Sequence, residues 1–341
     1  MIRFDSDYTE GCIPEILIAL TNSNDEQTIG YGKDDHCLNA AKLIKQAIKH
    51  DDADIHFMVG GTQTNIAVIT AILKHYQGAI CAESGHINAH ETGALEAVGH
   101  KCLTLPTSNG KITAEQVDTL IQNHYNDASA EHTVQPGIVY ISFPTESGTL
   151  YSKQELTELY AVCQTHNIPL FIDGARLGYG LMAKNNDVTF EDIANLCDVF
   201  YIGGTKVGAL FGECIVILND LYKKDFRYSI KQHGGMLAKG RMLGIQFEEL
   251  FKDNRYLTIS KHAIDMADIL TEGFQSKGYS FFFPAETNQL FPIFENTKLE
   301  ELSQEFAFTP WIKIDETHTA VRFVTSFATK RKNIEYLLTK I

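Results

Sequence analysis

Two apolar segments of the sequence end in residues that could perform chemistry. The segment PLFIDGAR ends in Asp173, and Arg176 follows three residues later. The segment DVFYIGGTKVG places Lys206 in a glycine-rich turn after another apolar stretch. A lysine between buried strands is costly unless it is paired or used covalently. Taken alone, the aspartate is more typical of a turn or a helix cap, and the lysine is more typical of a solvated loop.

A third segment, MVGGTQTNIAVITAIL, could hold a phosphate group. Its glycines and hydroxyl residues open a helix predicted over residues 62–76, where free backbone N–H groups and the positive end of the helix dipole favour an anion. Many Gly-Thr pairs only cap helices, so the segment alone is weak evidence. The turn GGTKVG lacks the spacing of a P-loop, and no strand is followed by G-x-G-x-x-G, which argues against a nicotinamide oxidoreductase.

The elements that must position these segments alternate between about residues 55 and 218. Short β-rich runs such as GIVYI and PLFID are separated mainly by amphipathic helical patterns. This alternation is typical of an α/β domain with a largely parallel sheet. Helix signals are clear at 113–123 and at 152–166, where Ser152 and Glu155 form a capping box. In such sheets ligands bind outside the carboxyl ends of the strands.

The chain is longer than a typical single domain, and we expect three parts. These are an N-terminal segment over residues 1–13, a large α/β domain over 14–250 and a small α+β domain over 251–341. After about residue 250 the pattern changes to one long helix, at 260–273, followed by short strands and a closing helix. No Pro/Gly linker separates the two domains, so we expect them to pack directly.

The order of phosphate loop, strand-end aspartate and a lysine 33 residues later resembles that of fold-type I pyridoxal-phosphate (PLP) enzymes. Seven blocks are similar, in order and over nearly the whole chain, to those of the L-threonine aldolase family: FDSDYTEG, YGKDD, GGTQTN, ESGHINAHETGALE, DGARL, GGTKVG and VRFVTSFATKRKNIEYLL. The resemblance implies an α/β fold with a large PLP-dependent transferase-like domain (aspartate aminotransferase, fold type I) and a smaller α+β domain. It also implies pyridoxal 5'-phosphate as the cofactor.

The resemblance gives the matching residues roles around the cofactor. Lys206 would hold PLP covalently, and Asp173 would bond the pyridine nitrogen and make the ring an electron sink. His86 would stack on the face of the ring. Lys239 would reach the phosphate of a neighbouring subunit. The phosphate would otherwise be held by the backbone and side chains of Gly61, Thr62 and Gln63.

The resemblance also implies how the substrate is held. Ser6, Arg176 and Arg322 match groups that grip the substrate carboxylate, a task suited to a planar guanidinium. One segment departs from the family pattern: SFPTESGTLYS places Glu146 about where many threonine aldolases carry a second histidine. That segment looks more like the branch of phenylserine aldolases and β-eliminating lyase relatives. Glu146 is therefore a candidate for the group that moves a proton, and His86 and His90 compete with it.

The resemblance implies an enzyme that cleaves L-threonine, L-allo-threonine or a related β-hydroxy-α-amino acid to glycine and an aldehyde. A PLP-dependent β-eliminating lyase acting on another amino acid is the alternative, because it would share every residue except those that move the proton. A PLP-fold protein that binds a ligand without catalysis is a third possibility. The presence of Asp173, Arg176 and Lys206 together argues against it.

Composition limits the partners of the chain. Its net charge of -14 argues against nucleic acid, because binding a polyanion needs clustered Lys and Arg. There is no uncharged apolar stretch of 18 residues, and the start MIRFDSDYTEG lacks a signal-like pattern, so we expect a cytoplasmic protein with no membrane partner. We expect a small amino-acid substrate. The resemblance implies a homodimer or homotetramer with its site at the subunit interface.

The cysteines and histidines give no sign of a metal or a disulfide framework. The seven cysteines include no C-x-x-C pair, and most lie in apolar runs, so we interpret them as buried thiols. His86 and His90 are four residues apart on a predicted helix and could share a metal ion. No third ligand is evident, and we therefore expect no metal site.

Overall fold

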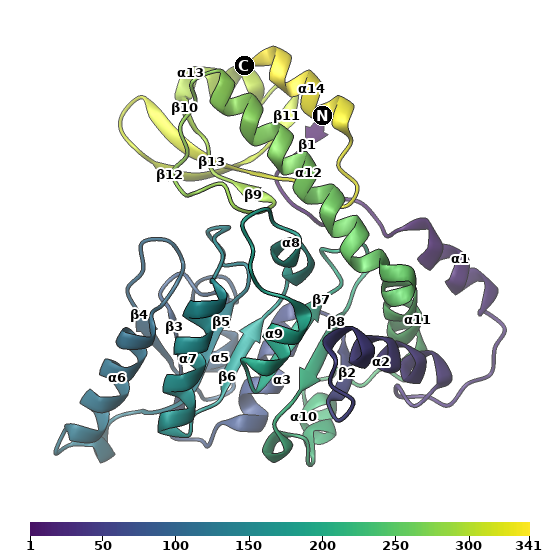
Figure 1. Ribbon diagram of the computed structural model, residues 1–341, viewed down its shortest axis with the longest axis vertical. Coiled ribbons are helices and arrows are strands. Elements are labelled where there is room, and N and C mark those ends of the chain that lie inside the picture. Colours follow the sequence, from purple (N-terminus) through teal and green to yellow (C-terminus); the bar gives the residue numbers. More distant parts are fainter.

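A seven-stranded sheet forms the centre of the larger of two packed parts (Figure 1). The structure is a computed structural model and describes all 341 residues. The spatial order of the strands is β2-β8-β7-β6-β5-β3-β4, and only β8 runs antiparallel to its neighbours. The strands are β2 (Asp54–Met58), β3 (Gln77–Ala82), β4 (Cys102–Leu105), β5 (Gln135–Ser142), β6 (Leu170–Asp173), β7 (Val199–Gly203) and β8 (Glu213–Ile217).

The central strands are buried on both faces, which explains why they are almost continuously apolar. Successive side chains of a strand point to opposite faces. Ile138 and Tyr140 of β5 therefore pack in one core cluster, while Val139 and Ile141 pack in the other. The predicted α/β domain with a largely parallel sheet is confirmed.

Helices cover both faces of the sheet. One core cluster lies between the sheet and α3 and α10, and includes Val68 and Ile230. The larger cluster lies on the opposite face and includes Ile44 of α2 and Phe247 of α11. The helices of this part are α1 (Pro14–Asn22), α2 (Asp35–Ile48), α3 (Gly61–Ile72), α4 (His86–Ala89), α5 (Ala94–Ala97), α6 (Ala114–Asn126), α7 (Lys153–His166), α8 (Leu177–Leu181), α9 (Phe190–Asn195), α10 (Phe226–Gln232) and α11 (Arg241–Phe251), with short 3-10 turns η1 (Ala130–His132) and η2 (Asp220–Tyr222).

The predicted helix signals correspond to α3, α6 and α7. The Ser152 hydroxyl accepts from the Glu155 backbone N–H at 3.2 Å and Glu155 accepts from the Ser152 N–H at 2.7 Å, so the predicted capping box is present. Helix α3 ends at Ile72, although the pattern predicted a helix as far as Tyr76. Because residues 74–76 are exposed, no packing holds them in the helix.

The smaller part is built from short strands and two helices, and both chain termini lie in it (Figure 1). Strand β13 pairs antiparallel with β10, β12 and β9. Strand β1 pairs parallel with β11, and Phe4 joins the core of this part. The segment predicted as a separate N-terminal part thus contributes its first strand here. The elements are β1 (Ile2–Arg3), β9 (Gln289–Leu290), β10 (Ile293–Glu295), α13 (Asn296–Leu302), β11 (Phe306–Ala307), β12 (Thr309–Lys313), β13 (His318–Val324) and α14 (Arg331–Lys340).

One long helix joins the two parts. After α11, a 3-10 turn η3 (Lys252–Asn254) has positive φ angles at Asp253 and Asn254, and α12 (Arg255–Ser276) then runs for 22 residues. Tyr256, near the start of α12, packs in the large core, whereas Phe274, near its end, packs in the small core. The helix predicted at 260–273 is therefore longer at both ends, because both cores bury it.

Two further expectations concern the cysteines and membranes. Six of the seven cysteines are buried, Cys12 is partly exposed, and none forms a disulfide, which agrees with the interpretation as buried thiols. None of the helices combines the length and the apolar character that crossing a membrane requires.

Candidate active site

A cavity of about 370 Å3 opens at the carboxyl ends of the parallel strands. Its lining comes from residues at or just after the ends of β2, β5, β6 and β7, from His86 after β3, from Tyr8 of the N-terminal segment and from Glu213, the first residue of β8, which runs the opposite way. This edge of an α/β sheet is the usual place for a ligand. Seven residues that the sequence singled out line the cavity: Gly61, Thr62, His86, Glu146, Asp173, Arg176 and Lys206.

The glycine-rich segment after β2 forms the N-terminus of α3. Gly60 is the N-cap residue and Gly61 the first helical residue. A Cβ atom built on Gly60 would meet nothing within 4 Å, so its backbone is open to a ligand. The side chain of Gln63 is used elsewhere, because Nε2 donates to the His233 carbonyl at 3.0 Å and Oε1 accepts from the Val59 N–H at 3.3 Å.

Asp173 lies at the end of β6 and is almost fully buried. Its Oδ2 accepts from the Tyr140 hydroxyl at 2.6 Å and from Asn65 Nδ2 at 3.2 Å, and its Oδ1 accepts from the Ala175 N–H at 3.0 Å. Burial alone would raise the pKa of Asp173, but the charge of His86 and the tyrosine hydrogen bonds lower it further than burial raises it. Asp173 is therefore an ionised carboxylate that can balance a cation in the cavity.

Lys206 lies in the turn after β7, and its side chain faces the cavity. Its carbonyl oxygen accepts from the Tyr179 hydroxyl at 2.5 Å, which fixes the turn. Its amine makes no hydrogen bond or ion pair within the chain. Burial and the nearby charge of Arg176 lower the pKa of Lys206. At a given pH the neutral, nucleophilic amine is therefore more populated than in an ordinary lysine.

His86 begins α4 and lines the cavity, but His90 does not. The His86 Nδ1 atom lies 2.7 Å from Oε1 of Glu91. Burial lowers the pKa of His86, but the hydrogen bond to Glu91 and the charge of Asp173 raise it above its ordinary value. His90 is exposed, its ring centre lies 5.7 Å from that of His86, and its pKa is lowered by partial burial and by the charge of His86.

Glu146 follows β5 and has one carboxylate oxygen engaged and one free. Oε1 accepts from the His86 N–H at 3.0 Å and from the Ser142 hydroxyl at 2.6 Å. Oε2 has no hydrogen-bond partner in the chain. Burial raises the pKa of Glu146, so this carboxyl can hold a proton near neutral pH more readily than an exposed glutamate.

The predicted carboxylate-binding residues are only partly brought together. Arg176 lines the cavity, and its Nε and Nη2 atoms form a bidentate pair with the buried Asp7, at 2.6 and 3.1 Å. Arg322, on β13, is outside the cavity lining; Nη2 donates to the Asp5 carbonyl at 3.2 Å, while Nε is buried without a partner. Ser6 lies in a separate surface cleft near Thr329.

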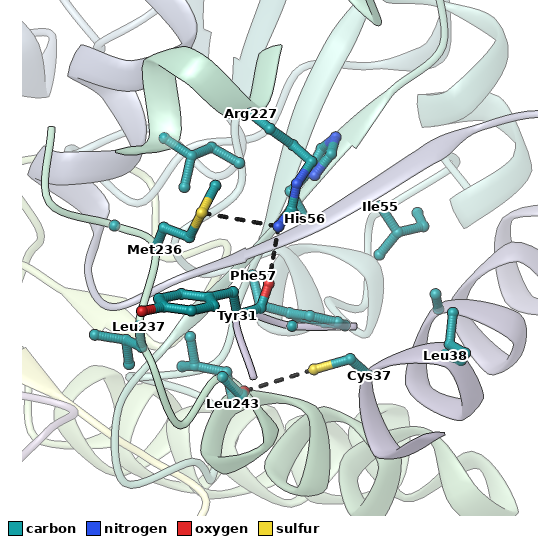
Figure 2. A pocket seen from close by; sticks show the side chains of 15 residues that line it. Tyr31, Cys37, Leu38, Ile55, His56, Phe57, Arg227, Met236, Leu237 and Leu243 are labelled. Carbon is teal, nitrogen blue, oxygen red and sulfur yellow. Dashed lines mark hydrogen bonds between the residues drawn. The ribbon is translucent and has the colours of Figure 1, made fainter. Parts of the chain in front are cut away.

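A second pocket, of about 90 Å3, shares no lining residue with the cavity around Lys206 (Figure 2). Its lining is mostly apolar, and Arg227 donates from Nη2 to the Tyr31 carbonyl at 2.9 Å. We interpret it as packing around the loop that carries Lys239. Lys239 itself is exposed and does not line the cavity of its own chain.

Several residues of the site were missed in the sequence. Tyr8 lines the cavity, and Asn65 and Glu91 are buried behind it. Glu213, the first residue of β8, also lines it; burial raises its pKa to about 8, although the charge of Lys206 opposes this. The signal for Glu213 was an acidic residue at the head of the apolar run CIVIL, and the signal for Asp7 was its place beside Ser6.

The residues of the cavity fit PLP. The open N-terminus of α3 suits a phosphate, the buried carboxylate of Asp173 suits a protonated ring nitrogen, and the unpaired amine of Lys206 suits a covalent bond to an aldehyde. His86 lies in the same lining and can contact a flat ring. No residue of the lining conflicts with this arrangement, apart from the extra carboxyl of Glu213.

Comparisons with known proteins agree with this fit. Residues 4–297 match the family model described as beta-eliminating lyase. The chain is 29% identical to a low specificity L-threonine aldolase of Pseudomonas aeruginosa over 303 residues, 88% of this chain and 86% of that protein. It is 43% identical to the solved structure of Leishmania major threonine aldolase, over 99% and 98% of the two chains, with a TM-score of 0.96.

A more distant structure bears on the fold alone. The aspartate aminotransferase of Thermus thermophilus is 14% identical, over 100% of this chain and 90% of that one, with a TM-score of 0.72. The predicted fold-type I architecture is thereby confirmed.

Proposed function

The chain belongs to the beta-eliminating lyase family and, within it, to the threonine aldolases, and we propose that it releases glycine from a β-hydroxy-α-amino acid. The chain is a PLP-dependent lyase. The proposed substrates are L-threonine, L-allo-threonine or a related amino acid, and the second product is an aldehyde. One observation carries the proposal: the unpaired amine of Lys206, the carboxylate of Asp173 and the open N-terminus of α3 meet in one cavity.

When bound, PLP supplies an electron sink for the bond that breaks at the substrate Cα. We assign Lys206 the covalent attachment, because its lowered pKa favours the neutral amine. Asp173 would keep the ring nitrogen protonated, and His86 would lie against the ring. Gly61 and Thr62 would hold the phosphate, with Gln63 bracing the loop through His233.

The substrate carboxylate is proposed to bind Arg176 and Arg322, with Ser6 nearby. Asp7 orients Arg176 by holding one edge of its guanidinium, which leaves Nη1 free. Arg322 Nε is a buried donor without a partner, and such donors are rare unless a ligand or water satisfies them. A carboxylate that reached both arginines would fix the Cα–Cβ bond relative to the ring.

Glu146 is proposed to take the proton of the β-hydroxyl group. Its free Oε2 and its raised pKa support this role, since a carboxyl that titrates nearer neutral pH can both accept and return a proton. His86 is the other group in the cavity that can exchange a proton. His90 is a weaker candidate because it is exposed and outside the lining.

We also propose a cytoplasmic homodimer or homotetramer with the site at the subunit interface and Lys239 reaching a neighbouring phosphate. Exposed apolar side chains support an interface: Leu17 and Ile18 on α1, and Ile29, Tyr31 and Leu38 after it. Lys239 lies on an exposed loop and is free to reach another chain. Sedimentation of the purified protein tests this, and a fully active monomer at assay concentration would contradict it.

Product analysis tests the proposed reaction. The PLP-loaded protein is incubated with L-threonine, L-allo-threonine and L-phenylserine, and glycine, aldehyde, ammonia and keto acid are measured. We expect equal amounts of glycine and aldehyde from at least one substrate. Ammonia with a keto acid, and no glycine, would favour the β-eliminating alternative.

A further inference from the structure

Behind His86 lies a carboxylate that the proposed reaction does not yet use. The side chain of Glu91 is only 1% exposed and lies outside the cavity lining, and its Oε1 is 2.7 Å from Nδ1 of His86. The same Oε1 accepts from Asn65 Nδ2, and as an acceptor for His86 as well it favours the ring form with the hydrogen on Nδ1. The other ring atom of His86, Nε2, has no partner in the chain and is left to the cavity.

Asn65 connects this pair to Asp173. Its Nδ2 donates to Glu91 Oε1 at 2.7 Å and to Asp173 Oδ2 at 3.2 Å. Its Oδ1 is buried without a partner. Flipping the Asn65 side-chain amide would place Oδ1 against two carboxylates. The observed orientation is therefore favoured, although it leaves Oδ1 without a partner. Asp173, Asn65, Glu91 and His86 thus form one hydrogen-bonded chain.

Other charged groups also act on His86. Asp173 at the end of β6 raises the pKa of His86 and Lys206 after β7 lowers it, while Glu146 accepts from the His86 backbone N–H. His90, on the same segment, is a further cation when protonated. Of these groups, Glu91 alone hydrogen-bonds the His86 ring.

We propose that Glu91 is a positioning residue that fixes His86 in its Nδ1–H form, so that Nε2 can exchange a proton with the substrate, and that Asn65 ties this pair to Asp173. The inference rests on the proposed function. A proton from a water molecule or from the substrate, other than the β-hydroxyl proton assigned to Glu146, moves to Nε2 and gives the imidazolium, whose charge Glu91 balances. When this proton returns from Nε2, the neutral ring with its hydrogen on Nδ1 is restored, as in other carboxylate–histidine pairs.

Nitrogen-15 NMR of histidine-labelled protein tests the positioning role without turnover. His86→Asn identifies the His86 signal. We expect the neutral ring of wild type to carry its hydrogen on Nδ1, and we expect Glu91→Gln to move the His86 titration to lower pH. Glu96→Gln is the control, because Glu96 is exposed on the neighbouring helix α5. A neutral wild-type ring protonated on Nε2 would overturn the proposal, even where Glu91→Gln does not fold.

Kinetics supply the second readout. Glu91→Gln should lower kcat by about 10- to 100-fold, less than the roughly 100- to 10,000-fold typical of losing the proton-transferring group itself. In Glu91→Gln, the acid limb of the plot of kcat against pH should move to lower pH. Glu91→Asp should recover part of the lost kcat. An unmoved limb in a folded Glu91→Gln variant contradicts the proposal. Wild type that forms no glycine would instead refute the proposed function and leave the NMR result standing.

Discussion

Replacing Glu213 with glutamine should stabilise the cofactor-free protein increasingly as the pH rises from about 5 to 8. The Glu213 side chain is buried at the head of β8, and its Oε2 accepts from the Gly204 N–H at 3.0 Å. Burial raises its pKa from 4.5 to about 8, although the charge of Lys206 acts in the opposite direction. The folded protein therefore keeps a proton on Glu213 that the unfolded chain has already released.

Proton binding is linked to unfolding, and this linkage determines the direction and the size of the change in unfolding free energy. Protonated Glu213 contributes its full stability below pH 4.5, and this contribution is lost as the pH rises through about 8. A difference of about 3.5 pH units corresponds to roughly 5 kcal/mol, at about 1.4 kcal/mol for each unit. Glutamine is neutral at every pH and does not lose this contribution.

Urea unfolding of both proteins at several pH values measures the effect. The free energy of unfolding of Glu213→Gln minus that of wild type should be near zero at pH 5 and should increase by several kcal/mol at pH 8. Subtraction removes the contributions of the other acidic groups that the two proteins share. Glu96→Gln, at an exposed site, should show a constant difference. A Glu213→Gln difference that does not change between pH 5 and 8 would show that the folded protein does not hold a proton on Glu213.

Two substitutions test the proposed roles in binding and proton transfer. Arg322→Lys should raise KM for amino-acid substrates and leave PLP binding intact, because the buried Nε donor is lost and a charge-assisted hydrogen bond contributes about 1.5 to 3 kcal/mol; unchanged KM with weaker PLP binding would contradict the role. Glu146→Gln should lower kcat by about 100- to 10,000-fold with little effect on KM. Near-normal kcat in that variant would move the role to His86, and His86→Asn and His90→Asn on the same substrate identify the group.

The parts of the site that lie at strand ends could be predicted from the sequence. Asp173 and Lys206 each follow an apolar run, and parallel strands bring the ends of such runs to one edge of the sheet. Gly61 and Thr62 could be placed for the same reason, since glycines opened a helix directly after a strand. Local patterns were sufficient here because each residue is positioned by the element next to it.

The residues that were missed depend on pairings between distant segments. Asp7 meets Arg176 across 169 positions, and β1 reaches β11 across about 300, which no local period reveals. Ser6 and Asp7 also show that two neighbouring residues can lie in different sites. Asp7 is buried against Arg176, whereas its chain neighbour Ser6 lies in another cleft.

Glu91 and Glu213 were missed for a different reason. A glutamate in ESGHINAHETGALE or GECIVI could equally be solvated, and only the packed structure shows that both are buried. Their partners, His86 and the turn around Lys206, were already predicted as parts of the site. The sequence therefore located more of the residues that line the cavity than of the residues buried behind it.

Reductive trapping identifies the lysine that carries the cofactor, which we propose is Lys206. The PLP-loaded protein is treated with borohydride, digested, and its peptides are analysed by mass spectrometry for a lysine that has gained the reduced cofactor. We predict modification at Lys206, and we predict that Lys206→Ala loses both the label and the visible absorption of the bound cofactor. A label on another lysine, or a Lys206→Ala protein that keeps the visible absorption and the turnover, would show that Lys206 does not carry the cofactor.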